Sequence, residues 1–336
     1  MWLEALGLAL AAYIAWTIGA NDAANPTDTA VGSGALTLKK ALLLFSAFAF
    51  AGAMIQGWMV MKTFGKGVAE ITELWDAVAA AAATAAWVTL ASLKGLPIST
   101  THSAVGAVIG VALTKMFFLG YPEAIDLKVL SAVILSWITS PLGAMALAAI
   151  LYPMARRLYT RLGGRADKAF RWLLIGALAY SAYSFGANDV GNAVGVYSAF
   201  AHVTGAAWFD PRVLAALGSA GIMLGGLTVG RRVVQTVAFG ITRLDLATGF
   251  AAELSNALVV WLFTTIPSML FGYGMPISTT HASVSAVIGV GLAKYGWRGV
   301  DWGTIAKIVA GWVLTVPAAA AMAIVIRAAP ALLGLV

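Results

Sequence analysis

Residues 95–113 read GLPISTTHSAVGAVIGVAL, and residues 274–292 read GMPISTTHASVSAVIGVGL. The two stretches are identical at 14 of 19 positions. A second pair of motifs repeats in the same order, because residues 19–25 read GANDAAN and residues 186–192 read GANDVGN. Self-similarity at a nearly fixed spacing is typical of a duplicated structural unit. The sequence therefore predicts two related halves.

The composition places both halves in a membrane. Of the 336 residues, 61% are hydrophobic and 10% are charged, and the mean hydropathy is +0.89. Soluble proteins carry about 25% charged residues, whereas apolar runs of about 20 residues are what a membrane span needs. We predict an all-α polytopic membrane protein in a lipid bilayer, which excludes a soluble enzyme, a disulfide-rich scaffold and a single-span receptor. The net charge of +7 reflects loop topology, and we predict no nucleic-acid partner.

Each half contains five apolar stretches long enough to cross a bilayer. The predicted spans are residues 3–24, 41–61, 76–93, 97–117 and 128–152, then 172–190, 213–230, 246–271, 276–294 and 303–326. The segments that follow the two GAND motifs, 25–36 and 190–205, are too short or too rich in glycine to span. We predict re-entrant or broken helices there, which gives about ten to twelve membrane elements in total.

An odd number of spans in each half makes the second half inverted relative to the first. We therefore divide the chain into a membrane repeat at 1–153, a basic linker at 154–171 and an inverted membrane repeat at 172–336. Lys and Arg gather in cytoplasmic loops, and a cytoplasmic linker puts fifteen of the 21 basic residues on that side. The basic residues left outside are Lys62, Lys66, Lys115, Lys128, Arg212 and Arg327. We predict a multi-pass protein of the cell membrane, plasma or inner, with both termini outside.

Two acidic residues lie where the bilayer makes charge costly. Asp22 and Asp189 occupy matching positions in the two GAND motifs, and an ionised Asp at the bilayer centre costs about 2.5–3.5 kcal/mol. Asn25 and Asn192 follow at the same spacing, and the glycine that begins each motif is expected where a helix breaks and frees carbonyl groups. Carboxylate, amide and carbonyl oxygens suit a small hard cation. The alternative is that each Asp caps a re-entrant helix.

The repeated PISTTH motif has the composition of a helix start. Pro fits the first turn and Ser or Thr caps it, and such an end binds anions through unpaired N–H groups and a partial positive charge. In an inverted repeat, two such ends can converge on one tetrahedral anion. The candidate anion ligands are Ser99, Thr100, Thr101, Ser278, Thr279 and Thr280. The alternative is that these hydroxyl groups only cap the helices.

Three other residues have two interpretations each. His102 and His281 end the two PISTTH motifs and either contact a ligand or a proton, or orient the loop. Glu253, in GFAAEL at 249–254, is either a charge in the first turn of a helix or a ligand of a coupling ion.

The paired motifs in an inverted duplication resemble those of the inorganic phosphate transporter (PiT) family, and the resemblance extends over nearly the whole chain. It implies cation-coupled uptake of inorganic phosphate, commonly with Na⁺ and in some members with H⁺ or a metal–phosphate complex. It also implies a homodimer with about twelve membrane elements in each subunit. The implied Na⁺ site comprises Asp22, Asn25, Asp189 and Asn192. The implied phosphate site comprises the six hydroxyl residues with Asn21 and Asn188.

We therefore predict a secondary active transporter that imports phosphate by cation symport through alternating access. No resident cofactor is expected, and Na⁺ is the expected coupling ion. A permease for sulfate or another oxyanion and a passive anion channel are the alternatives. We predict no enzymatic activity, because the sequence has no cysteine, no HExxH and no nucleophile elbow.

Overall fold

The computed structural model describes residues 2–64, 68–69, 71–118, 120, 125–198 and 207–332. These residues are almost entirely helical and form no β-strand. Ten long helices of the described chain match the ten predicted spans in order. They are α1 (Trp2–Asp22), α3 (Leu38–Gln56), α5 (Leu74–Leu93), α6 (Thr100–Phe118), α7 (Leu127–Leu162), α8 (Ala166–Ser198), α10 (Pro211–Thr228), α12 (Leu246–Phe271), α13 (Thr279–Tyr295) and α14 (Trp302–Leu332). Eight stretches are long and apolar enough to cross a membrane, one of them covering α7 and α8 together.

Helices of each half pack on helices of the other half. Helix α1 of the first half packs on α10 of the second, and α8 of the second half packs on α3 of the first. In the same way, α6 packs on α14 and α13 packs on α7. The described residues also form three short α-helices, namely α2 (Asp28–Gly32), α4 (Trp58–Lys62) and α11 (Arg231–Gly240). The halves therefore form one interlocked bundle.

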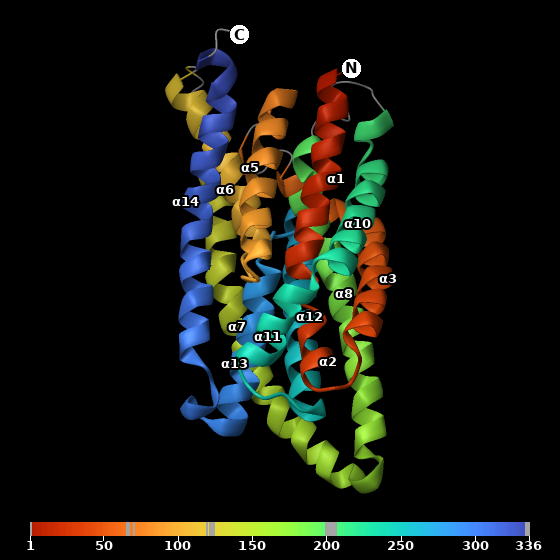
Figure 1. Cartoon of the computed structure of the whole chain (residues 1–336). Coiled ribbons are helices and arrows are strands. Elements are labelled where there is room, and N and C mark those ends of the chain that lie inside the picture. The colour runs from red at the N-terminus through yellow and green to blue at the C-terminus, as the bar shows by residue number, and fades with distance from the viewer. Residues whose placement is uncertain are drawn as a thin grey trace.

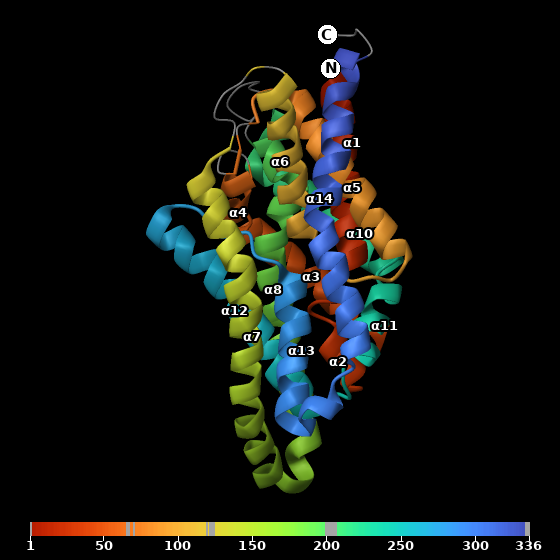
Figure 2. The same ribbon diagram turned by 90° about the vertical axis from the view of Figure 1, so that its left-hand side faces the viewer.

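The second half is inverted relative to the first. Both termini lie at one end of the bundle, here called the upper end, and the connection between α7 and α8 lies at the lower end (Figure 1). Helices α5 and α6 form a hairpin in the upper part, whereas α12 and α13 form one in the lower part (Figures 1 and 2). The hairpin tips touch, because Thr101 Oγ1 donates to the Ile277 carbonyl at 2.8 Å and Thr280 Oγ1 to the Ile98 carbonyl at 3.0 Å. These four predicted spans thus form two opposed hairpins.

Only one of the two GAND motifs interrupts its helix. Helix α1 ends at Asp22 and five residues in turns precede α2, whereas α8 continues without a break from Ala166 to Ser198. The predicted break in the second half is therefore wrong over 190–198, and residues 199–206 lie outside the described chain. The physical reason is Pro26, which has no N–H group to continue a helix. The matching position in the second half is Ala193, a good helix former.

The glycine that begins each GAND motif permits close packing and does not break a helix. A Cβ on Gly19 would lie 2.0 Å from the Ile222 carbonyl oxygen of α10, and one on Gly186 would lie 1.9 Å from the Ala49 carbonyl oxygen of α3. Small residues allow membrane helices to cross at such short separation. The crossings α1–α10 and α8–α3 therefore depend on these two glycines.

We expect Gly186→Ala to destabilise the protein by about 1–3 kcal/mol, because the added methyl group overpacks the α8–α3 crossing. The matched control is Gly176→Ala in the same helix, where an added Cβ meets no atom within 4 Å. That substitution should be neutral or stabilising, since Ala favours a helix over Gly by about 0.5–1 kcal/mol. Unfolding in mixed detergent micelles measures both variants, and equal stabilities would contradict the packing argument.

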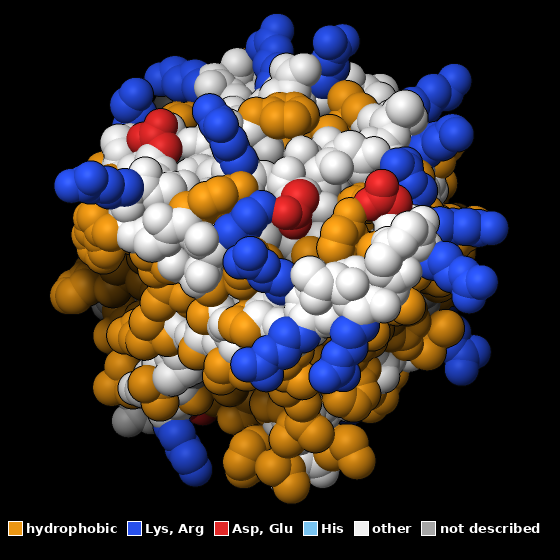
Figure 3. Space-filling model, turned by 90° about the horizontal axis from the view of Figure 1, so that it is seen from below, with side chains coloured by type: hydrophobic (Ala, Val, Ile, Leu, Met, Phe, Trp, Pro, Cys, Tyr) orange, Lys and Arg blue, Asp and Glu red, His pale blue; other side chains and the backbone are white. Residues whose placement is uncertain are grey.

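The basic linker is helical and lies at the lower end. Helix α7 extends to Leu162 and α8 begins at Ala166, with a short 3₁₀ turn, η2 (Gly163–Arg165), between them. Lys and Arg side chains gather on the lower face of the molecule, with few Asp or Glu among them (Figure 3). The charge asymmetry counted in the sequence is therefore a property of one end of the bundle.

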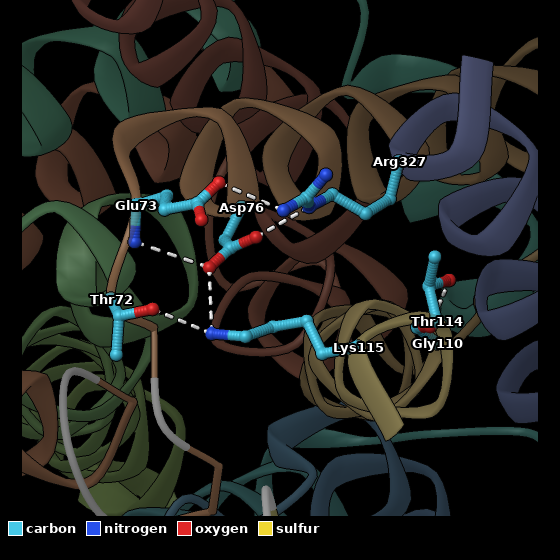
Figure 4. Close-up of polar contacts among 7 residues, drawn as sticks. All are labelled: Thr72, Glu73, Asp76, Gly110, Thr114, Lys115 and Arg327. Carbon is cyan, nitrogen blue, oxygen red and sulfur yellow. Dashed lines mark hydrogen bonds and ion pairs between the residues drawn. The ribbon is translucent and has the colours of Figure 1, made fainter. Parts of the chain in front are cut away.

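A buried ionic network holds the upper end together. Lys115 of α6 lies 3.1 Å from Asp76 of α5 and donates to Thr72 at 2.6 Å, while Arg327 of α14 donates to Asp76 at 2.5 Å and to Glu73 at 2.8 Å (Figure 4). Asp76 is fully buried and Lys115 is 1% exposed. The sequence had placed Lys115 and Arg327 with the outside loops, but both lie in helices and are buried.

Candidate functional site

The two PISTTH motifs place two helix N-termini against each other. In both halves the serine caps its helix, since Ser99 Oγ accepts from the His102 N–H and Ser278 Oγ accepts from the His281 N–H, each at 3.1 Å. Helices α6 and α13 begin at the next residue. Because the hairpin tips touch, both helix starts present their N–H groups and hydroxyls near one point in the bundle.

Each GAND motif contacts the hydroxyl groups of the opposite half. The Asn25 amide donates to Thr279 and Thr280, both at 3.1 Å. In the symmetric contact, the Asn192 amide donates to Thr101 at 3.0 Å and to Thr100 at 3.5 Å. The four predicted motifs thus converge on one site, with each half supplying the amide that binds the hydroxyls of the other.

Two carboxylates lie within this site. Asp22 accepts hydrogen bonds from Thr100 at 2.5 Å and from Thr280 at 3.3 Å. Asp189 accepts from the Asn192 amide at 2.8 Å and from Thr100 at 3.5 Å. Both side chains are fully buried, and the Thr100 hydroxyl lies between the two carboxylates, within 3.5 Å of each. Neither forms an ion pair in the described part of the chain.

Several oxygen atoms of the site have no hydrogen-bond donor. They are Asn188 Oδ1, Asp189 Oδ2 and Asn192 Oδ1, all buried. Buried polar atoms are almost always paired in folded proteins. A carboxylate with neighbouring amide and hydroxyl oxygens is the donor set that a small hard cation prefers. The residues present therefore fit a cation. The alternative, that Asp22 caps a helix, is not favoured, because Asp22 accepts from threonine hydroxyls and not from the helix N–H groups that a cap requires.

Asn21 and Asn188 support the hairpin tips. Asn21 donates to Ser92 and to the Leu96 carbonyl, both at 3.0 Å, and accepts from the Ile98 N–H at 3.1 Å. Asn188 donates to Thr264 at 2.7 Å and to the Met275 carbonyl at 2.9 Å. These contacts position the start of each PISTTH helix. A direct contact of either amide with phosphate stays a prediction.

The two motif histidines face each other between two tryptophans. Their ring centroids lie 4.5 Å apart, with His102 3.7 Å from Trp137 and His281 3.7 Å from Trp312. This stack of four rings joins the starts of α6 and α13 to α7 and α14. The arrangement favours the orienting interpretation of the histidines over direct ligand contact.

Glu253 lies apart from the central site, in the second turn of α12. It is fully buried and accepts a hydrogen bond from the Thr29 hydroxyl. Asp28, beside Thr29, is also fully buried and was not among the predicted site residues. An available signal was its position, since Asp28 is the one charged residue between Asp22 and Lys39.

An inverted duplication that buries carboxylates, amides and helix N-termini at its centre is the architecture of a membrane transporter. The model of the phosphate transporter family matches residues 18–165 and 160–323. The chain belongs to this family.

Individual relatives agree with the family assignment. A Pyrococcus abyssi protein named "Putative phosphate permease" is 32% identical to this chain, and the match covers 97% of each protein. The chloroplastic inorganic phosphate transporter 2-1 of Arabidopsis thaliana is 28% identical, over 93% of this chain and 70% of its own length. The solved structure of a sodium-dependent phosphate transporter superimposes with a TM-score of 0.83 at 27% identity, covering 99% of this chain and 100% of that one.

Proposed function

We propose that this member of the phosphate transporter family imports inorganic phosphate by Na⁺ symport through alternating access. The observation that carries the proposal is that the same threonine hydroxyls donate hydrogen bonds to a buried carboxylate and lie where an anion would bind. Thr100 and Thr280 donate to Asp22, and they also lie at the helix starts that would receive an anion. Phosphate cannot occupy these donors beside two ionised carboxylates without strong repulsion.

Bound cations would supply the positive charge that neutralises the carboxylates of Asp22 and Asp189. When Na⁺ binds the oxygens of Asp22, Asn25, Asp189 and Asn192, the carboxylates no longer need the threonine hydroxyls as donors. The hydroxyls of Thr100, Ser99, Ser278 and Thr279 are then available to phosphate. Thr101 and Thr280 would also have to exchange the Ile277 and Ile98 carbonyls for the anion. The coupling of cation to anion therefore follows from sharing of hydroxyl donors between the two sites. The structural relative named for sodium dependence supports Na⁺ as the cation.

Unpaired acceptors favour phosphate over sulfate. At neutral pH phosphate still carries an O–H donor, whereas sulfate carries none. Asn188 Oδ1 is buried without a donor and is not among the proposed cation ligands, and the Asn188 amide group lies at the tip of the α12–α13 hairpin. A site with a buried acceptor discriminates against a ligand that leaves the acceptor unpaired.

The orientation in the membrane follows from the surface charge. Many Lys and Arg side chains gather on the lower face (Figure 3), and such residues are concentrated on the cytoplasmic side of membrane proteins. We infer that the lower end faces the cytoplasm of the cell membrane and that both termini lie outside. A homodimer stays a prediction.

Uptake of labelled phosphate into proteoliposomes tests the proposal. We expect uptake to require an inward Na⁺ gradient, to fall at least about ten-fold when choline replaces Na⁺, and to be abolished by arsenate but not by sulfate. Uptake that is indifferent to the gradient would indicate a passive anion channel. Inhibition by sulfate and not by arsenate would indicate another oxyanion permease, and dependence on pH alone would identify H⁺ as the coupling ion.

A further inference from the structure

The connection between α13 and α14 lies at the lower end of the bundle (Figures 1 and 2) and contains a short 3₁₀ turn, η4 (Trp297–Gly299). A pocket of about 400 Å³ opens beside it, lined by Arg243, Tyr295, Arg298 and Gly299. Pockets that bind small molecules measure about 300–1,000 Å³. None of the lining residues belongs to a GAND or PISTTH motif. The pocket is therefore separate from the central site and large enough for a charged headgroup or a small anion.

The two arginines of this pocket have no partner in the protein. Neither Arg243 nor Arg298 forms an ion pair or a side-chain hydrogen bond with any residue that the structure describes, and both are exposed. The acidic residues nearby already have partners. Asp245 pairs with Lys294, and Asp301 Oδ1 accepts from an N–H group in the first turn of α14 at 3.0 Å. Two uncompensated positive charges therefore line one pocket.

Hydrogen bonds join the two sides of the pocket. Thr242 Oγ1 donates to the Gly299 carbonyl at 2.7 Å, and the Asp301 N–H donates to the Ile241 carbonyl at 2.9 Å. These bonds connect the segment before α12, which carries one arginine, to η4, which carries the other. The fold therefore fixes the backbone positions of both arginines relative to each other.

The first half of the repeat has no arginine at either position. The repeated stretches of α6 and α13 relate Arg298 to Leu119, and the capping boxes that begin α5 and α12 relate Arg243 to Ile71. The fold therefore does not require arginine here. The concentration of basic residues on the cytoplasmic side accounts for positive charge at this end, but it does not account for a pocket lined by two arginines without an acid.

The pocket lies at the depth of lipid headgroups. Helix α13 begins at the central site and ends at Tyr295 after 17 residues, which corresponds to about 25 Å at 1.5 Å per residue. Half of a bilayer measures about 20–22 Å when its headgroups are included. Trp297, next to Arg298, stacks on Trp302 with the ring centroids 4.0 Å apart, and tryptophan is enriched where membranes meet water. The pocket therefore faces the headgroup layer.

An apolar surface leads from the pocket toward the bilayer centre. Trp302, Val309 and Val313 share one face of α14, because positions seven and eleven residues apart return to the same side of a helix. Both valines are exposed on the outside of the bundle. The acyl chains of a lipid whose headgroup occupies the pocket would lie along this face. Free phosphate has no group that would use it, so the surface favours a lipid as the ligand.

We propose that this pocket binds the headgroup of an anionic phospholipid from the lower leaflet, with Arg243 and Arg298 on its phosphate group and its acyl chains along α14. The planar guanidinium group forms paired hydrogen bonds with phosphate oxygens. Basic pockets between membrane helices on the cytoplasmic side are typical sites for anionic headgroups. The proposal goes beyond the proposed function and does not depend on it, because lipid binding is measured without transport.

Native mass spectrometry of the purified full chain in a neutral detergent tests the proposal, with dioleoylphosphatidylglycerol as the probe. We expect Arg243→Gln and Arg298→Gln each to weaken the tightest-bound lipid at least about five-fold, which is the contribution of one arginine to binding at an anionic membrane surface. The matched control is Arg161→Gln, because Arg161 is an exposed arginine at the same end of the bundle. It should bind this lipid as the unaltered protein does. Dioleoylphosphatidylcholine, which has no net charge, should bind all four proteins equally.

The other outcomes would each overturn the proposal. Equal affinity for phosphatidylglycerol in both pocket variants and the unaltered protein would show that the arginines hold no lipid. An equal loss in Arg161→Gln would indicate attraction by the general positive charge of the lower end. Displacement of the lipid by inorganic phosphate, abolished by Arg243→Gln, would assign the pocket to a free phosphate ion.

Discussion

Asp22→Asn is expected to reduce Na⁺-driven phosphate uptake at least about 100-fold, because removing one charge from a buried charge pair costs about 3–5 kcal/mol. The amide has the shape of the carboxylate, but Thr100 and Thr280 donate to different oxygens of Asp22, and the single amide oxygen keeps one of these two hydrogen bonds. It cannot provide the negative charge that attracts the cation. Initial uptake rates in proteoliposomes, at equal protein incorporation, measure the loss.

The stability of the same variant distinguishes function from structure. Asp22 is fully buried without an ion-pair partner in the described chain, so the neutral amide relieves an unfavourable buried charge. We therefore expect Asp22→Asn to unfold no earlier than the unaltered protein. Asp126→Asn is the control for uptake and should transport normally, because Asp126 is an exposed carboxylate that caps α7 through the Lys128 and Val129 N–H groups, and Asn caps a helix equally well. Normal uptake by Asp22→Asn would contradict the proposed cation site, and lost uptake with lost stability would indicate a structural role for Asp22.

The repeat made much of this fold predictable from the sequence. Long apolar runs fixed the ten long helices to within a few residues at most ends, and the duplication predicted the inverted halves. The predicted and observed helix ends differ most at α7 and α8. Both helices extend through the charged linker, because nothing in residues 154–162 stops a helix. The hairpin character of α5–α6 and α12–α13 was not predicted, since span length alone does not show where a helix pair turns back.

The site was partly predictable for a similar reason. Matching motifs identified Asp22, Asn25 and the threonines because both copies carry them. The crossing of contacts, in which Asn25 binds Thr279 and Thr280 of the other half, depends on tertiary packing. Asp28 escaped notice because it has no counterpart in the repeat, Gly195 standing in its place. A search based on repetition finds shared residues and overlooks those that one half has acquired alone.

Lys115→Met is expected to destabilise the protein by about 3 kcal/mol, because it leaves excess negative charge in a buried network. Lys115 contacts Asp76 at 3.1 Å and Thr72 at 2.6 Å, and its side chain is 1% exposed. Arg327 would remain on Asp76, but it already bridges to Glu73. Methionine has similar length and fills the same space without a charge. Unfolding in mixed detergent micelles measures the difference.

The second half provides the matched control. Lys294 stands at the position equivalent to Lys115 in the repeated motif, and it pairs with Asp245 at the start of α12. Burial would raise the pKa of Asp245, but hydrogen bonds from Lys294 and Thr248 outweigh this and lower the pKa below its ordinary value. The pair is therefore ionised at neutral pH. It is also exposed, with Lys294 18% and Asp245 51% accessible, and exposed pairs contribute about 0–1 kcal/mol.

Comparing the two lysines separates burial from charge pairing. Lys294→Met should cost less than about 1 kcal/mol, although it removes the same kind of pair from the equivalent position. Combining Lys115→Met with Asp76→Leu should cost less than the sum of the single variants, because the two side chains interact directly. Equal effects at the two lysines, or additive effects of the double variant, would contradict the network. The expected asymmetry means that buried charges hold the α5–α6 hairpin to α14. Among the residues that the structure describes, the α12–α13 hairpin has an exposed ion pair at its open end instead, and we expect it to be the easier of the two to move.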